Sequence, residues 1–409
     1  MIIRAPVVVT MDGPPIENGA AAISGNRIID VGKFPEIAAR HSGEEIVDLD
    51  EQVLLPGLVN AHCHLDYTCL RGKIPPQRSF ADWIRCINAE KGRLSAKDYV
   101  ASIREGFTES KKFGITTIAN LTAFPELIAK IETPIRTWWF AELIDVRNPD
   151  RANEVVESAV KSLKSTERWG LGPHAPFTAS PNLYRRCEQI ARTENAMLTT
   201  HLAESREEMS MFCDANGPLY EFMRGLGRPM EDCGHETPLE RFVGALGERA
   251  LPLRWIVAHL NELEESDFDL LARSTRKFHI VHCPRSHKYF GHSPFRFEEL
   301  RELDFNICLG TDSLASNNDF SLFAEMRAFQ KEFPGVSPGE TLSMVTVNPA
   351  RALRQEKALG KIRPSFYADL VSIPYRGAAN LFEEILAFDR PVNWLMVDGK
   401  IWEGDASGR

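Results

Sequence analysis

Pro56-Gly-Leu-Val-Asn-Ala-His62-Cys-His64-Leu-Asp66 is the stretch of sequence that decides the fold. It continues the apolar residues 53–55, so a near-continuous apolar run ends in two histidines two positions apart. Such a run is typical of a strand in a parallel sheet that is covered on both faces. Side chains two apart on a strand share one face, so His62 and His64 can reach the same metal ion. Taken alone, the pair also fits two histidines that face solvent.

Seven more apolar runs follow this one, and most of them end in polar residues. They cover residues 115–121, 136–142, 170–174, 196–201, 253–259, 278–282 and 305–312. Amphipathic stretches that predict helices lie between them, most clearly over residues 101–113, 153–165, 182–194 and 265–274. Apolar strands that alternate with helices indicate an α/β fold with a parallel sheet. Eight such units over about 295 residues match the size of a (β/α)₈ TIM barrel, which is the fold we predict.

The last residues of these runs share a chemical character. Five runs end in histidine and one ends in aspartate, and these residues are His62, His174, His201, His259, His282 and Asp312. In a (β/α)₈ barrel the carboxyl ends of all strands meet at one mouth, where active sites lie. The sequence therefore predicts a site at the mouth that is rich in imidazole.

The two ends of the chain differ from the middle. Residues 2–50 and 360–402 show short alternating strands and turns. Neither segment is long enough for a stable core of its own, so we expect both to pair into one small β-sandwich beside the barrel. The predicted domains are residues 1–55 and 356–409 for the two parts of this sandwich, and residues 56–355 for the barrel.

Composition narrows the class of partner. The formal charge is −9 without a long basic run, which argues against a nucleic-acid partner. No stretch approaches the roughly 20 apolar residues that span a bilayer, and the first residues lack the pattern of a signal peptide. Eight scattered cysteines without a Cys-x-x-Cys pair suit reduced thiols in the cytoplasm. We therefore expect a cytoplasmic protein with a small-molecule substrate, for which an even-numbered homo-oligomer is the default.

The stretch from Pro56 to His64 resembles the opening motif of the amidohydrolase superfamily, Pro-Gly-Leu/Phe-(Ile/Val)-(Asn/Asp)-x-His-x-His. Other motifs resemble its mononuclear deaminase and chlorohydrolase branch. His201 and Glu204 stand in Thr200-His-Leu-Ala-Glu-Ser205, which is similar to that branch's His-x-x-Glu. Asp312 stands in Gly-Thr-Asp-Ser, and His259 closes the sixth run.

The resemblance implies a role for each of these residues. His62, His64, His201 and Asp312 would bind one metal ion, because the run 170–174 offers no lysine at its end to bridge two ions. Three imidazoles and one carboxylate suit Zn²⁺ best, and Fe²⁺ would accept the same ligands. Glu204 would be the general acid/base, His259 would orient the attacking water, and Asp312 would also accept a proton. The implied reaction is hydrolytic deamination of an amino-heterocycle with release of ammonia.

Candidate substrate contacts come from the same resemblance. Phe80-Ala-Asp-Trp83 and Glu90 look like the loop of S-adenosylhomocysteine and methylthioadenosine deaminases in which a Trp and a Glu contact the ribose. His174 matches a substrate-contacting position of that branch. The alternatives are that Trp83 packs in a core, that Glu90 lies on a solvated helix face, and that His174 is held by neighbouring polar groups.

The seventh run departs from the branch's His-Cys/Asn-Pro-x-Ser-Asn. It reads His282-Cys-Pro-Arg-Ser-His287, which places Arg285 and His287 where the pocket mouth is expected. This variant looks like the aminodeoxyfutalosine deaminases, whose substrate is an adenosine that carries a benzoate. Arg285 would then bind the carboxylate. The alternative is that Arg285 pairs with a carboxylate of a nearby loop.

The leading functional prediction is deamination of an adenosine-type nucleoside derivative, similar to aminodeoxyfutalosine, S-adenosylhomocysteine or methylthioadenosine. Deamination of a free base such as guanine or cytosine, and hydrolytic dechlorination of a triazine, stay open because pocket shape decides among them. An inactive binding homologue would be expected to have lost a ligand, whereas all four ligands are present.

Overall fold

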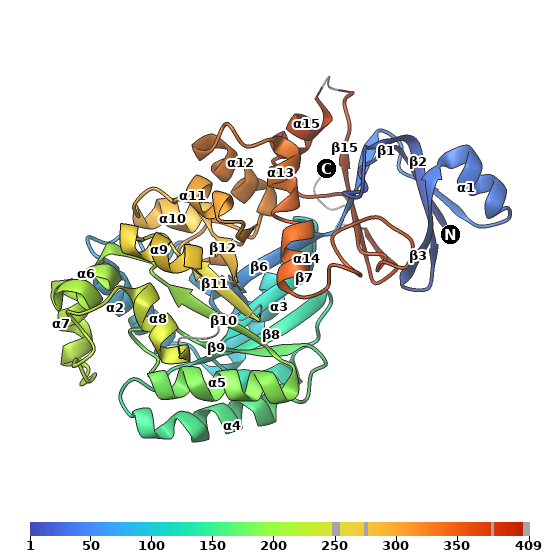
Figure 1. The fold of residues 1–409 in the computed structure, drawn as a ribbon. Coiled ribbons are helices and arrows are strands. Elements are labelled where there is room, and N and C mark those ends of the chain that lie inside the picture. Colours follow the sequence, from blue (N-terminus) through green and yellow to red (C-terminus); the bar gives the residue numbers. More distant parts are fainter. Residues whose placement is uncertain (248–253, 274–276, 378–379, 404–409) are drawn as a thin grey trace.

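In the computed structural model the described residues are 1–247, 254–273, 277–377 and 380–403, and they form two β-sheets. One sheet carries most of the helices around it, and the other lies to one side and contains strands from both terminal segments of the described residues (Figure 1). None of the described helices is long and apolar enough to cross a membrane.

The first sheet is wholly parallel, and its strands follow one another around a barrel. In spatial order the strands are β13 (Asn306–Leu309), β12 (His279–His282), β11 (Trp255–His259), β10 (Met197–Leu202), β9 (Trp169–Pro173), β8 (Arg136–Leu143), β7 (Ile115–Thr122), β6 (Leu58–His64) and β14 (Asp312–Ser313). From β6 to β13, each strand thus neighbours the one before it in the sequence, as in a (β/α)₈ barrel.

The barrel closes at a break within the last predicted strand. Its first half, β13, pairs with β12, and its second half, β14, pairs with β6. Between the halves, the Gly310 N–H donates to the His282 carbonyl and the Thr311 N–H donates to the His62 carbonyl. A Cβ at Gly310 would come within 2.8 Å of the His62 carbonyl oxygen, so this crossing requires a glycine. The predicted α/β barrel is confirmed.

Helices cover the outside of the barrel (Figure 1). Those of the barrel are α2 (Phe80–Lys91), α3 (Ala96–Lys112), α4 (Ala152–Leu163), α5 (Pro181–Glu194), α6 (Arg206–Asp214), α7 (Gly217–Gly225), α8 (Pro238–Leu246), α9 (Glu265–Arg273), α10 (Pro284–Phe290), α11 (Phe297–Glu302), α12 (Leu322–Glu332), α13 (Pro338–Ser343) and α14 (Val347–Ala352). Short 3₁₀ turns are η1 (Leu65–Leu70), η2 (Pro125–Lys130) and η3 (Pro149–Arg151). All four predicted helices are present, although Ser274, like Leu253 of the sixth run, lies outside the described residues.

Local signals explain why these helices begin and end where they do. Helix α5, for example, begins after Ser180, whose side chain accepts from the Leu183 N–H, and Pro181 occupies its first position. Both features stabilise a helix start. The helix ends at Asn195, whose left-handed backbone is typical of a helix C-terminus.

The second sheet joins the two ends of the chain. Its strands run in the order β17 (Lys400–Glu403), β16 (Trp394–Val397), β15 (Leu370–Pro374), β5 (Gln52–Pro56), β1 (Ile2–Val8), β2 (Ile16–Ser24) and β3 (Arg27–Lys33), and β4 (Ile46–Asp48) also pairs with β1. Helices α1 (Phe34–Arg40) and α15 (Leu381–Ala387) lie in these terminal segments. The predicted small β domain built from both termini is confirmed, and its strands form one mixed sheet.

A buried ion pair links the terminal segments to the barrel. The Arg136 guanidinium, at the start of β8, lies 3.1 Å from an Asp369 carboxylate oxygen and 2.9 Å from an Asp398 oxygen. The side chains of Arg136 and Asp369 are both buried. Because this contact lies at the amino end of β8, it leaves the opposite, carboxyl ends of the strands free to build a site.

Candidate active site

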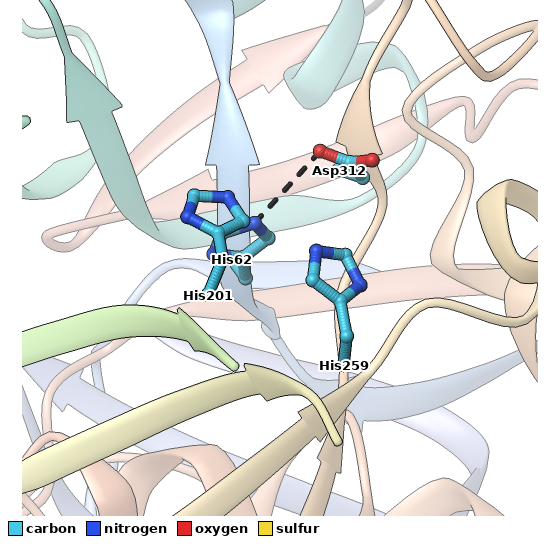
Figure 2. Close-up of side chains that lie close together, drawn as sticks. All are labelled: His62, His201, His259 and Asp312. Carbon is cyan, nitrogen blue, oxygen red and sulfur yellow. Dashed lines mark ion pairs between the residues drawn. The ribbon is translucent and has the colours of Figure 1, made fainter. Parts of the chain in front are cut away.

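Four buried side chains meet at the carboxyl ends of the barrel strands (Figure 2). They are His62 from β6, His201 from β10, His259 from β11 and Asp312 from β14. Each offers one ligand atom, and these atoms all lie within 4.8 Å of one another. His62 Nε2 lies 3.8 Å from Asp312 Oδ1, the pair marked by the dashed line in Figure 2. The structure thus brings together three histidines and one aspartate from four different strands.

His64 lies beside this cluster. Its Nε2 is 3.2 Å from His201 Nε2 and 3.8 Å from Asp312 Oδ1, while its Nδ1 is 3.4 Å from Glu142 Oε2. Of the four predicted ligands, His62, His201 and Asp312 belong to the cluster, and His64 lies next to His201 and Asp312. His259 completes the cluster, and its Nε2 also lies 3.8 Å from Glu204 Oε1.

The donor atoms fit a divalent metal ion. Both ring nitrogens of His62 and the Nε2 of His259 are buried and have no hydrogen-bond partner among the described residues. Burial lowers the pKa of His62, His64 and His259, so their imidazoles are neutral and can offer lone pairs. Neutral imidazoles with one carboxylate are the donor set that Zn²⁺ prefers in proteins. Nearly every buried polar group in a folded protein has a partner, and a bound ion would supply one here.

The backbone and two serines aim Asp312 at the imidazoles. His259 and Asp312 have φ angles of 74° and 57°, in a region that non-glycine residues rarely adopt and that is often found at functional sites. The Ser286 hydroxyl donates to Asp312 Oδ2 over 2.7 Å, and the Ser316 hydroxyl lies 3.0 Å from the same oxygen. Oδ1 is thereby left facing the histidines. Although burial opposes the effect, the hydrogen bond from the Ser286 hydroxyl helps to hold the pKa of Asp312 below its usual range.

The carboxyl group of Glu204 differs from that of Asp312 in its place and in the direction of its pKa shift. It follows β10 and lies outside the four-residue cluster, although it is buried and faces His259. Its backbone N–H donates to Glu208 Oε2, and its carbonyl accepts from the Asn261 side chain. Burial raises the pKa of Glu204 well above its usual range, and the negative charge of Asp312 adds to this. The carboxyl can therefore carry a proton near neutral pH.

A cavity of about 410 Å³ opens above these residues. Its floor contains His64, His201, Glu204, His259 and Asp312. Much of its wall is aromatic and includes Tyr67, Phe80, Trp83, Phe177 and Phe222. This volume, with an apolar wall above a few convergent polar groups, is typical of a pocket for a small organic molecule.

Two of the predicted substrate contacts lie in this cavity. Trp83 lines the wall and stacks on Phe80, with ring centroids 6.0 Å apart. His174 lines the floor, where its Nδ1 lies 2.6 Å from the Thr178 hydroxyl and its ring centroid is 4.8 Å from that of His201. Both side chains are therefore placed to contact a bound molecule.

The structure places Glu90 away from the cavity. Helix α2 turns Trp83, Ile87 and Lys91 toward the cavity at the spacing of a helical face, and Glu90 lies off this face. Its carboxylate pairs with Arg93 instead. The solvated helix face, considered above as the alternative, is the observed position.

The structure also places Arg285 and His287 away from the cavity. After β12 the chain forms helix α10, which turns Ser286 toward Asp312 and the two neighbouring side chains away from it. Arg285 Nη1 lies 2.6 Å from Asp319 Oδ1, and His287 Nε2 lies 2.8 Å from the Ser293 carbonyl oxygen. Neither residue is among the described residues that line the cavity. Arg285 thus pairs with a loop carboxylate, which is the alternative considered above.

Three further cavity residues were not predicted from the sequence. Glu142 closes the run 136–142 and shares the inward face of β8 with Phe140, so its position at a strand end was a usable signal. Lys91 and Arg147 bring positive charge to the cavity from α2 and from the segment after β8. No motif marks either of them, because helix phase and loop path decide where they point.

Comparisons with known proteins agree with this geometry. Residues 53–402 match the sequence profile of the amidohydrolase family. The 5-methylthioadenosine/S-adenosylhomocysteine deaminase of Moorella thermoacetica is 28% identical to the chain over an alignment that covers 98% of the chain and 93% of that relative.

Two solved structures share the fold over nearly the whole chain. The aminofutalosine deaminase of Helicobacter pylori, in complex with methylthio-coformycin, gives a TM-score of 0.86 at 20% identity and covers 98% of this chain and 99% of its own. The atrazine chlorohydrolase of Arthrobacter aurescens TC1, complexed with zinc, gives 0.81 at 20% identity, with 98% and 95% covered. Because the family profile spans most of the sequence and the barrel ends in the expected cluster, the chain belongs to the amidohydrolase family.

Proposed function

We propose that this protein is a metal-dependent hydrolase that deaminates an adenosine-type nucleoside derivative and releases ammonia. The observation that carries the proposal is Glu204, a buried carboxyl with a raised pKa at the cavity floor, 3.8 Å from His259. Deamination needs a proton donor beside the ring nitrogen, and Glu204 is placed to be one. The deaminase from Moorella thermoacetica, similar over almost its whole length, supports this reaction class.

The proposed metal ligands are His62, His64, His201 and Asp312, holding one divalent ion. Zn²⁺ suits this set best and is present in the Arthrobacter aurescens structure, while Fe²⁺ accepts the same ligands. When bound, the ion supplies a Lewis acid that lowers the pKa of a bound water toward about 7. We assign His259 to the water rather than to the ion, because its Nε2 faces Glu204.

The residues of the chain then divide the proton transfers between them. Asp312 Oδ1, which faces the histidines, accepts a proton from the attacking water, and His259 Nε2 holds the water in position. The protonated carboxyl of Glu204 donates to the ring nitrogen next to the carbon that bears the amino group. As the C–N bond breaks, the proton held by Asp312 passes to the leaving amine, which departs as ammonia. The new C–OH group becomes a carbonyl and returns its proton to Glu204. One water is consumed for each ammonia released.

A panel of substrates tests the proposed reaction. Metal-loaded enzyme would be assayed for ammonia with adenosine, 5′-methylthioadenosine, S-adenosylhomocysteine, aminodeoxyfutalosine, guanine and cytosine, and for chloride with a chlorotriazine. We expect ammonia from at least one of the four nucleosides. Ammonia from the free bases alone, or chloride release alone, would replace the nucleoside proposal with one of its alternatives.

The cationic residues of the cavity suggest what the far end of the substrate carries. Lys91, Arg147 and Arg151 all line the cavity, and Arg151 is paired with Glu154 over 2.6 Å. Arg147 is exposed and lies in the segment that follows β8. We propose that Lys91 and Arg147 together favour a nucleoside whose 5′ substituent bears a carboxylate.

The variant Arg147→Gln tests this assignment. We expect KM to rise about 10-fold for a carboxylate-bearing substrate, because one charge-assisted contact is lost, and to stay unchanged for neutral 5′-methylthioadenosine. Arg151→Gln is the matched control, since its guanidinium already has a carboxylate partner. An equal rise in KM for both substrates would remove Arg147 from carboxylate recognition.

A further inference from the structure

A second group of metal-ligating side chains lies outside the barrel. It consists of His282, His287 and Glu332, whose ligand atoms all lie within 4.8 Å of one another. His282 is the last residue of β12, His287 lies in α10, and Glu332 is the last residue of α12. These elements neighbour one another on one side of the molecule (Figure 1). The group thus joins a strand to two helices that cover it.

His282 points away from the catalytic cavity. Along β12, Val281 faces inward and belongs to the apolar cluster with Ala61 and Cys308, so the residues on either side of it face outward. The His282 ring stacks on Phe295, with centroids 4.1 Å apart and planes 4° from parallel. This imidazole therefore lies between the barrel wall and the outer helices, which explains why it does not join the other strand-end histidines at the mouth.

The two ring nitrogens of His282 make no hydrogen bond within the described part of the fold. Its side chain is fully buried, and neither ring nitrogen has a hydrogen-bond partner among the described residues. Buried polar atoms are nearly always paired, so two orphaned nitrogens on one ring need an explanation. Burial also lowers the pKa of His282, which keeps the ring neutral and one nitrogen lone pair available.

His287 and Glu332 supply two further groups that could bind the same metal ion as His282. His287 is buried, and its Nε2 lies 2.8 Å from the Ser293 carbonyl oxygen. A carbonyl can only accept, so the Nε2 carries the proton and Nδ1 keeps a lone pair. Metal-binding histidines typically have this arrangement, with one nitrogen on the ion and the other donating to a carbonyl. Glu332 adds a carboxylate to the group, and because this side chain is exposed, the group is in contact with solvent there.

We propose that His282, His287 and Glu332 bind a second divalent transition-metal ion, separate from the catalytic one. Two neutral imidazoles and one carboxylate are a donor set that Zn²⁺ uses with water in the remaining position. The ion ties the ends of β12, α10 and α12 together. Because α10 also carries Ser286, which donates to Asp312, the second ion stabilises the helix that supports the active site.

Zinc binding by the full-length protein tests this proposal without reference to turnover. Metal-stripped protein would be dialysed against increasing Zn²⁺, with zinc per chain and Tm measured at each concentration. We expect two classes of site, and a Tm that rises further as the second class fills, because a ligand that binds only the folded state stabilises it. A wild-type chain that saturates at one zinc would overturn the proposal.

Two variants and a control locate the second ion. Glu332→Gln changes an exposed side chain, and His282→Phe keeps an aromatic ring stacked on Phe295. We expect the affinity of the second class to fall at least about 10-fold in each, since even a partner behind a metal ligand contributes 10- to 100-fold. Glu302→Gln, also the exposed last residue of a helix, should leave it unchanged. A second zinc that binds equally well in both variants would contradict the site.

Discussion

Replacing Glu204 by glutamine should leave the metal content unchanged and lower the rate of ammonia release at least about 10²-fold, the usual contribution of a general acid–base group. Glutamine has nearly the shape of glutamate, and Glu204 lies outside the four-residue cluster, so the ligands stay in place. The amide cannot pass a proton to the ring nitrogen. Its neighbours Glu208 and Asn261 hold the backbone on both sides, so the position of the side chain is preserved.

The control for this variant is an equally buried glutamate outside the cavity. Glu188 on α5 is 7% exposed, as is Glu204, and it accepts from the Trp255 indole N–H. Glu188→Gln keeps an acceptor there and should retain full turnover. Zinc content and initial rates would be measured on both variants at saturating substrate. A Glu204→Gln enzyme with undiminished turnover would remove the proposed proton donor.

Replacing His64 by alanine should abolish both metal binding at the catalytic site and all turnover. The Nε2 of His64 is 3.2 Å from that of His201, so the two imidazoles point at one position, and Glu142 lies behind the other nitrogen. A carboxylate behind an imidazole is a common support for a metal ligand.

Replacing His259 by glutamine should give a different result, with metal retained and turnover lost, because its Nε2 faces Glu204.

The variants His64→Ala and His259→Gln together decide which of these two histidines is the third imidazole ligand of the catalytic metal ion. Tightly bound zinc and ammonia release would be measured for each, with His279→Ala as the control. His279 is a buried histidine at the opposite end of β12, and its Nδ1 contacts the Asn306 side chain. Loss of metal in the His259 variant together with a metal-loaded, active His64 variant would exchange the two roles.

Much of this fold could be predicted from the sequence, because each barrel strand is an apolar run and its last residue lies at the mouth. The rule that strand ends converge correctly brought together His62, His201, His259 and Asp312. It fails for His282, where the pleat turns the side chain outward. Convergence is thus a property of strand ends, and the direction of each side chain depends on its position in the pleat.

The substrate contacts were harder to predict, because they depend on helix phase and on the path of short segments. Trp83 lies on the inward face of α2, whereas Glu90 lies off that face and Lys91 takes its place. The residues after β12 form a helix, so Arg285 reaches Asp319. Only the three-dimensional course of these segments decides which charge faces the cavity.

The most direct test of the central claim is the rate of ammonia release from a 5′-substituted adenosine, measured while zinc is titrated into metal-stripped enzyme. We predict no release without metal, a rate that rises with the first zinc equivalent, and a plateau once that equivalent is bound. The product should be the corresponding hypoxanthine nucleoside, formed in equal amount with ammonia. Ammonia release that is as fast in the stripped enzyme, or none at full loading with any such nucleoside, would contradict metal-dependent deamination at this site.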